Sequence, residues 1–106
     1  MNRKSDIVVV GSGLAGMSAA LTAAQSGKSV TLLTHGAGTL AISSGCIDVL
    51  GYQDGTRVED PFESMAALPA GHPYSLIGGA EVVRESLDWL KGICRKGGID
   101  MAPAAE

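Results

Sequence analysis

Three glycines between residues 11 and 16 could build a binding site for the pyrophosphate of a dinucleotide. They follow the spacing GxGxxG in the stretch GSGLAG. The first glycine permits a tight turn out of a strand, the second lets the backbone approach a phosphate, and the third lets a helix pack closely. The N-terminus of that helix would offer unpaired N–H groups and a partial positive charge to the phosphates. We therefore predict that the cofactor-binding residues include Gly11, Ser12, Gly13, Leu14, Ala15 and Gly16.

This spacing is informative only if a strand precedes it and a helix follows it. Residues 7–10 (IVVV) are β-branched and end at a glycine, which predicts a buried strand. Residues 14–26 are rich in Ala and Leu and precede Gly27, which predicts a helix. Residues 29–33 (SVTLL) predict a second buried strand. Strand, helix and strand in this order form a parallel, right-handed βαβ unit, so the predicted fold is α/β and Rossmann-like, binding FAD or NAD(P).

The second predicted strand does not end in the acidic residue that is typical of this fingerprint. That residue lies about twenty positions further on and binds the ribose hydroxyls, and here the position is Thr34. A threonine hydroxyl can contact ribose, but without charge assistance the hydrogen bond is weaker. This favours FAD, which has further surface for anchoring, over a tightly bound NAD. No arginine follows the strand to bind a 2′-phosphate, which argues against NADP.

Composition excludes several classes of function. The chain has 106 residues, of which 45% are hydrophobic and 18% charged, as expected for one small globular domain. A net charge of −3 provides no basic surface for nucleic acid. Cys46 and Cys94 form neither a CxxC motif nor a Cys/His cluster, so we expect reduced thiols, no metal site and a cytoplasmic protein.

A secretory signal and a membrane span are both disfavoured. The basic start MNRK is followed by an apolar stretch, as in a signal peptide, but the glycines at 11–16 interrupt the apolar helix that such a peptide needs. No run approaches the ~20 apolar residues of a membrane span. We therefore interpret the N-terminal stretch as part of the fold.

The remainder of the chain is predicted to be mainly helical. Segment 35–52 is rich in Gly and Ser, with a short helical turn at 39–43. Asp60 precedes a proline and lies three residues before a glutamate, a capping pattern that predicts a short helix at 61–68. Residues 69–74 are predicted to be a turn-rich connection. An apolar stripe of period near 3.6 then predicts a helix from residue 80 to the glycines at 97 and 98.

Several stretches resemble known flavoproteins. GSGLAGMSAA resembles the N-terminal FAD-binding segment of such proteins. AISSGCIDVLG (41–51) and HPYSLIG (72–78) resemble the B subunit of anaerobic, quinone-linked glycerol-3-phosphate dehydrogenases. The resemblance extends from residue 6 to residue 78. It implies that residues 1–106 are the N-terminal part of one larger, doubly wound FAD-binding domain, with a βαβ unit (6–34), a flavin-contact segment (35–51) and a helical continuation (60–98).

The resemblance also assigns roles to the segment after the second strand. In fumarate-reductase-like flavoproteins a Ser/Thr- and Gly-rich segment there lies along the flavin, and the alternative here is an ordinary surface loop. A histidine of that segment tethers FAD in some of these proteins, and the matching position is Gly38, which implies non-covalent FAD, with FMN as the alternative. The implied cofactor contacts, beside Thr34, are His35, Thr39, Ser43, Ser44 and Gly45.

The activity implied by the resemblance is oxidation of sn-glycerol 3-phosphate to dihydroxyacetone phosphate, with electrons passed to quinone in anaerobic respiration. The implied partners are a catalytic A-type flavoprotein subunit and a membrane-anchoring iron–sulfur subunit, which would hold the protein at the inner face of the cell membrane. No residue is a convincing general base, so the catalytic residues stay unknown, and we expect this segment alone to be inactive. The alternatives are another fumarate-reductase-like flavoprotein with a different substrate, or a non-catalytic truncated dinucleotide-binding module.

Overall fold

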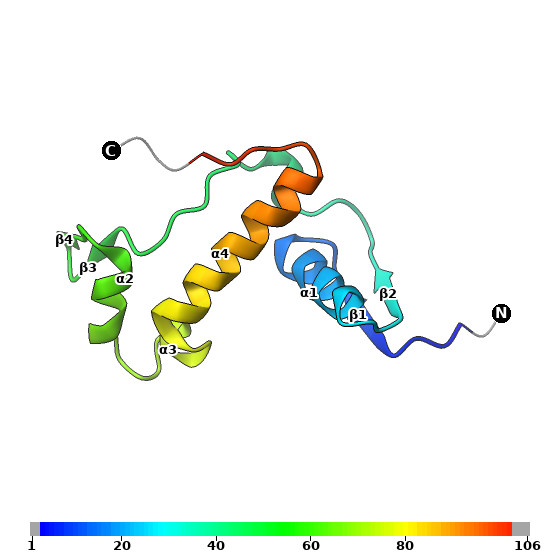
Figure 1. The fold of residues 1–106 in the computed structure, drawn as a ribbon, viewed down its shortest axis with the longest axis horizontal. Helices are drawn as coiled ribbons and strands as arrows, with labels where there is room; N and C mark the ends of the chain where they lie inside the picture. Colours follow the sequence, from blue (N-terminus) through cyan, green and yellow to red (C-terminus); the bar gives the residue numbers. More distant parts are fainter. Residues whose placement is uncertain (1–2, 103–106) are drawn as a thin grey trace. The chain divides into compact units, whose positions relative to one another are not determined.

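The computed structural model describes residues 3–102. Its elements divide into two compact units, Met1–Ile47 and Asp48–Glu106. Figure 1 shows the helices and strands of both units along the chain.

The first unit is the predicted βαβ arrangement. Strand β1 (Ile7–Val10), helix α1 (Leu14–Gln25) and strand β2 (Val30–Leu33) follow one another, and each lies within one residue of the predicted bounds. The two strands are parallel, with Ile7 opposite Val30 and Val10 opposite Leu33. A short 3₁₀ helix, η1 (Thr39–Ile42), follows where a helical turn was predicted. The α/β, Rossmann-like fold class is therefore confirmed, and this unit would carry the predicted phosphate loop.

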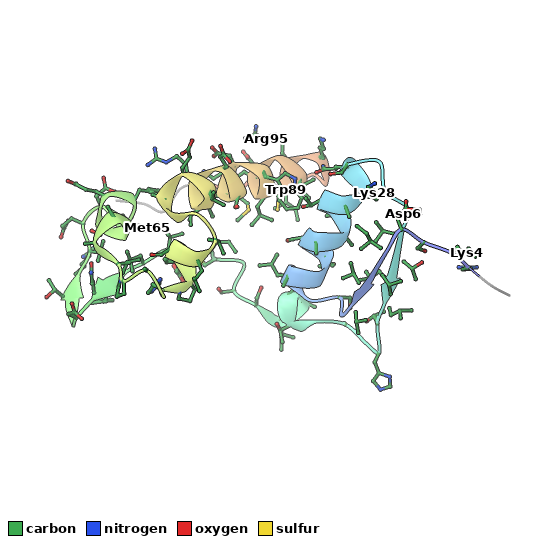
Figure 2. The ribbon with its side chains drawn as sticks, turned by 90° about the horizontal axis from the view of Figure 1, so that it is seen from below. Lys4, Asp6, Lys28, Met65, Trp89 and Arg95 are labelled. Carbon is green, nitrogen blue, oxygen red and sulfur yellow. The ribbon has the colours of Figure 1, made fainter. Side chains whose placement is uncertain are left out.

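Hydrogen bonds extend the pairing of β1 and β2 beyond both ends of the strands. The Ile7 N–H donates to the Ser29 carbonyl over 3.1 Å, and the Gly11 N–H donates to the Leu33 carbonyl over 2.8 Å. At the start of β1, Asp6 accepts hydrogen bonds from the Ser29 N–H (2.9 Å) and hydroxyl (3.0 Å). These bonds stabilise the ionised carboxylate and hold the pKa of Asp6 below its usual value. Figure 2 shows Asp6 where β1 begins.

The strands are more exposed than the sequence predicts. Val8 is 56% exposed, Val10 80% and Leu33 51%. A strand of a parallel sheet is buried on both faces only when helices cover both faces. Within the first unit the sheet has two strands and is accompanied by the single helix α1. The apolar runs therefore predicted the strands correctly, but the prediction that they are buried is wrong for the part of the chain described.

The second unit begins with a hairpin that the sequence analysis missed. Strands β3 (Tyr52–Gln53) and β4 (Thr56–Arg57) pair antiparallel around a two-residue turn. Asp54 and Gly55 form this turn with φ angles of +49° and +79°. An Asp-Gly pair is a strong signal for such a turn, because both central residues need a positive φ. The dipeptide at 54–55 was therefore the signal that could have predicted the hairpin.

Short helical turns fill the next part of the chain. The predicted helix at 61–68 is divided into α2 (Pro61–Ser64) and a 3₁₀ turn, η2 (Met65–Ala67). The Asp60 carboxylate caps α2, as predicted, by accepting from the N–H groups of residues 62 and 63 over 2.9 and 3.0 Å. The connection predicted at 69–74 instead contains the start of a helical turn, α3 (Pro73–Leu76). The preceding His72 caps this turn, because its Nδ1 accepts from the Tyr74 N–H over 3.1 Å.

Helix α4 (Gly79–Lys96) carries the core of the second unit. It begins one residue before the predicted start and ends before Gly97, as predicted. Val83 of this helix and Met65 of η2 are the two buried hydrophobic residues in the described part of the chain, at 6% and 4% exposure. The guanidinium of Arg84 lies 4.3 Å from the centre of the Phe62 ring, a cation–π contact between α4 and α2. Among the helices in residues 3–102, none is sufficiently long and apolar to cross a membrane.

Candidate cofactor-binding site

The N-terminus of α1 is the point at which the glycine loop meets the helix. Gly11 turns the chain out of β1 with a φ of +105°. Gly13 lies at the cap position, and no side chain caps the helix. The first bond inside the helix runs from the Met17 N–H to the Gly13 carbonyl over 2.9 Å. The N–H groups of residues 14–16 precede that bond and have no partner within the helix, so they are available to an anion.

Gly13 and Gly16 of the motif differ in what surrounds them. A Cβ added at Gly16 would lie 1.9 Å from the Gly11 carbonyl oxygen, so only glycine permits this approach of helix to strand. A Cβ added at Gly13 would meet nothing within 4 Å. That open space borders the uncapped N–H groups, and a side chain would fill it. The first turn of α1 holds no acidic residue that would repel an anion. The loop therefore fits the pyrophosphate of a dinucleotide.

A cluster of hydroxyl groups joins the glycine loop to the end of β2. The Ser12 hydroxyl oxygen lies 2.7 Å from the Thr34 hydroxyl oxygen and 2.9 Å from the Gly36 carbonyl oxygen. The Thr34 hydroxyl lies 2.6 Å from the same carbonyl and accepts from the Gly36 N–H over 3.2 Å. We call Ser12, Thr34 and Gly36 the hydroxyl clasp. It brings together two predicted site residues that lie 22 positions apart in the chain.

The segment after β2 lies directly against the glycine loop. A Cβ added at Gly38 would lie 2.7 Å from the Gly13 Cα, 2.9 Å from the Ser12 carbonyl oxygen and 3.0 Å from the Gly13 nitrogen. Because these neighbours are backbone atoms, no side chain fits at position 38 unless the two loops separate. The sequence analysis placed Gly36 and Gly38 in the flavin-contact segment (35–51) but named neither as a cofactor contact. The second glycine in HGAG, Gly38, was the available signal, since close backbone approach requires glycine. A Cβ at Gly36, in contrast, would meet nothing within 4 Å.

The remaining predicted flavin contacts lie between residues 35 and 45 and are exposed. His35 follows β2, and Thr39 begins η1. The Ser43 hydroxyl donates to the Leu40 carbonyl over 2.9 Å and accepts from the Gly45 N–H over 3.3 Å. The Ser44 hydroxyl accepts from the Cys46 N–H over 3.3 Å. These local bonds are those of a turn, so the role of His35, Thr39, Ser43, Ser44 and Gly45 in flavin binding stays a prediction.

Other chemically active side chains are scattered. Cys46 is exposed and Cys94 half-buried, and both are free thiols. His72 serves as a helix cap. Within residues 3–102 no three His, Cys, Asp or Glu side chains lie together in a way that could hold a metal ion. The geometry that could bind a ligand is therefore concentrated in the glycine loop and the segment packed against it.

Comparison with known proteins shows the family to which the chain belongs. Residues 6–105 match the family described as FAD binding domain. Over 100 residues the chain is 43% identical to the B subunit of anaerobic glycerol-3-phosphate dehydrogenase from Vibrio vulnificus, covering 91% of this chain and 23% of that protein. The protein of the same name from Vibrio cholerae is 46% identical over 90 residues, covering 81% and 20%.

A similar protein is also found in Halobacterium salinarum. The probable B subunit of anaerobic glycerol-3-phosphate dehydrogenase from Halobacterium salinarum is 41% identical over 87 residues, covering 79% of this chain and 20% of that protein. These names confirm the resemblance carried by the stretches at 41–51 and 72–78. The chain spans between a fifth and a quarter of the length of these relatives. No solved structure matches the chain.

Proposed function

Because the chain belongs to the family described as FAD binding domain, we propose that it is the FAD-binding segment of a flavin-dependent oxidoreductase subunit. The family supports FAD as the cofactor. The observation that carries the proposal is the uncapped N-terminus of α1, which opens onto free space at Gly13. An anion bound there would satisfy N–H groups that the helix leaves without partners.

The residues that would hold FAD belong to two neighbouring segments. In the glycine loop, the N–H groups of residues 14–16 would bind the pyrophosphate, and Gly13 would let it approach. In the segment after β2, the backbone at Gly38 lies so close to the glycine loop that no side chain fits at this position. FAD supplies the two-electron redox chemistry, while the protein binds and orients it. We propose one FAD-binding domain over 1–106, comprising the βαβ unit (6–34), the flavin-contact segment (35–51) and the helical continuation (60–98).

We further propose that the substrate is sn-glycerol 3-phosphate, which is oxidised to dihydroxyacetone phosphate. The names of the relatives support this substrate class. The electrons would then pass to quinone in anaerobic respiration. The alternatives are a fumarate-reductase-like flavoprotein with a different substrate, or a non-catalytic dinucleotide-binding module. We assign no catalytic residue.

The substrate proposal is tested by anaerobic reduction of the flavin. Protein expressed from the complete gene, together with its co-purifying subunits, is mixed with sn-glycerol 3-phosphate while the flavin absorbance near 450 nm is followed. We expect that absorbance to be lost because reduced flavin absorbs weakly there. Reduction by glycerol alone or by succinate but not by glycerol 3-phosphate would favour a different substrate. Retention of bound FAD with no reduction by any donor would favour the non-catalytic module.

We propose that the protein acts inside a complex, since its relatives are named as subunits. Its proposed partners are a catalytic A-type flavoprotein subunit and a membrane-anchoring iron–sulfur subunit. Through them it would lie in the cytoplasm at the inner face of the cell membrane.

The flavin is expected to be dissociable. Some fumarate-reductase-like flavoproteins tether FAD through a histidine in the segment after the second strand, and the resemblance puts Gly38 at that position. Gly38 has no side chain that could form a bond to flavin. The backbone atoms of Gly13 and Ser12 around that position leave no room for one. Acid precipitation of the purified holoprotein should therefore release the flavin into the supernatant, where chromatography distinguishes FAD from FMN. Flavin that remains on the washed pellet, attached to a peptide containing His35, would contradict this expectation.

A further inference from the structure

We propose that Ser12 is a positioning residue of the FAD site and that it acts through Thr34. In this role Ser12 fixes the turn after β2 against the glycine loop. Thr34 is then part of the wall of the site rather than a direct ligand of the ribose. The inference rests on the proposed function, since it concerns how the FAD site is held in shape.

The hydroxyl clasp contains fewer protons than hydrogen-bond contacts. Ser12 and Thr34 each carry one hydroxyl proton. Three contacts need such a proton: the one between the two hydroxyls and the one from each hydroxyl to the Gly36 carbonyl. If Ser12 donates to the carbonyl, Thr34 donates to Ser12. If Thr34 donates to the carbonyl, Ser12 donates to Thr34. In both arrangements the Thr34 proton is used within the protein.

The Thr34 oxygen is also engaged, because it accepts from the Gly36 N–H over 3.2 Å. A hydrogen bond donated by Thr34 to a ribose oxygen would therefore break a bond of the clasp. In the arrangement in which Thr34 donates to the carbonyl, both of its lone pairs are filled as well, by Ser12 and by the Gly36 N–H. In the dinucleotide fingerprint the acidic residue at this position contacts the ribose directly. In this chain the hydroxyl at the same position instead connects β2 to the glycine loop. This changes the interpretation that the sequence alone suggested for Thr34.

The clasp determines where the chain goes next. Residue 36 is held to both Ser12 and Thr34, and two residues later Gly38 lies in backbone contact with Gly13. Gly13 borders the open space proposed for the pyrophosphate. Loss of the Ser12 hydroxyl would remove both hydrogen bonds from the glycine loop to this turn, while the bonds between Thr34 and Gly36 remain. The turn would then be less firmly held beside that space. A loop that must be ordered when the ligand binds lowers affinity, because the ordering costs conformational entropy.

A double-mutant cycle on FAD affinity tests this inference. Protein from the complete gene is stripped of flavin, and the dissociation constant of FAD is measured by flavin fluorescence. We expect Ser12→Ala and Thr34→Val each to weaken binding about five- to tenfold, as for loss of one hydrogen bond. The double variant should be no weaker than Ser12→Ala, because that substitution alone removes both hydrogen bonds from the glycine loop to the turn. Thr34→Ser retains the hydroxyl and should bind FAD as the unmodified protein does.

A second measurement follows the clasp without flavin. In the stripped protein, hydrogen exchange at the Gly36 amide should be faster in Ser12→Ala than in the unmodified chain. Thr22→Val is the matched control, since the Thr22 hydroxyl bonds only locally, to the Ser18 carbonyl in α1 (2.8 Å). It should leave FAD affinity and Gly36 exchange unchanged.

The outcomes separate the inference from the proposed function. If the unmodified protein does not bind FAD, the proposed function is wrong. If it binds FAD, but Ser12→Ala has no effect while Thr34→Val weakens binding, Thr34 is a direct ligand and the inference is wrong. Additive losses in the double variant, or unchanged exchange at Gly36 in Ser12→Ala, would overturn it as well.

Discussion

Gly13→Val is expected to abolish FAD binding while leaving the fold intact. The Cβ at this position would meet no protein atom within 4 Å, so the substituted chain can keep its backbone. The side chain would instead occupy the space beside the uncapped N–H groups of α1, where we place the pyrophosphate. We expect FAD affinity to fall about a hundredfold or more, which corresponds to roughly 3 kcal/mol. Protein from the complete gene should purify without yellow colour and with an unchanged circular dichroism spectrum.

The matched control for this prediction is Gly71→Val. A Cβ at Gly71 likewise meets nothing within 4 Å, but the residue belongs to the second unit, before α3, and lies outside the flavin-contact segment. This variant should keep its full complement of flavin. An unchanged flavin-to-protein ratio in Gly13→Val would contradict the assignment of the glycine loop to the pyrophosphate.

Gly16→Ala is expected to have the opposite effect. It should lower the stability of the fold, and any loss of FAD affinity would be a consequence of that. The added Cβ would lie 1.9 Å from the Gly11 carbonyl oxygen and 2.8 Å from its carbon. Both are backbone atoms at the end of β1, so the helix must move away from the strand. Overpacking of this kind costs about 1–3 kcal/mol, and we expect the upper end because no flexible side chain can yield. Thermal unfolding of the flavin-free protein should shift several degrees lower, with a fall in soluble yield.

Gly92→Ala provides the comparison. Gly92 lies inside α4, and a Cβ there would meet nothing within 4 Å. Because alanine is favoured over glycine in a helix interior by about 1 kcal/mol, this variant should unfold at the same temperature or higher. Equal stability of Gly16→Ala and Gly92→Ala would show that α1 does not depend on its close contact with β1.

The two predictions assign different roles to Gly13 and Gly16, which the motif treats alike. In GxGxxG every glycine is equally required by the pattern. The structure shows that Gly16 is required by the protein's own backbone, whereas Gly13 borders space that the protein leaves open. A binding defect with an intact fold is therefore expected at one position, and a folding defect at the other.

The hydrogen bonds at Asp60 and His72 illustrate how much of the local structure was predictable. The cap at Asp60 was predicted because a capping side chain bonds to N–H groups two and three residues later in the chain. The capped turn after His72 was missed. A histidine is an uncommon cap, but its Nδ1 can accept from the N–H two residues later.

The sequence by itself determined the elements of the first unit, their order and the phosphate loop between them. Strand, helix and turn preferences depend on neighbouring residues, so IVVV, the Ala-rich run and the glycine spacing were sufficient. Only the tertiary structure decided that Ser12 bonds to Thr34 and that Gly38 contacts Gly13. Those contacts join segments more than twenty positions apart, and they depend on how β2 lies beside β1. The exposure of the strands was decided in the same way, because burial depends on which elements cover a sheet and not on the residues within it.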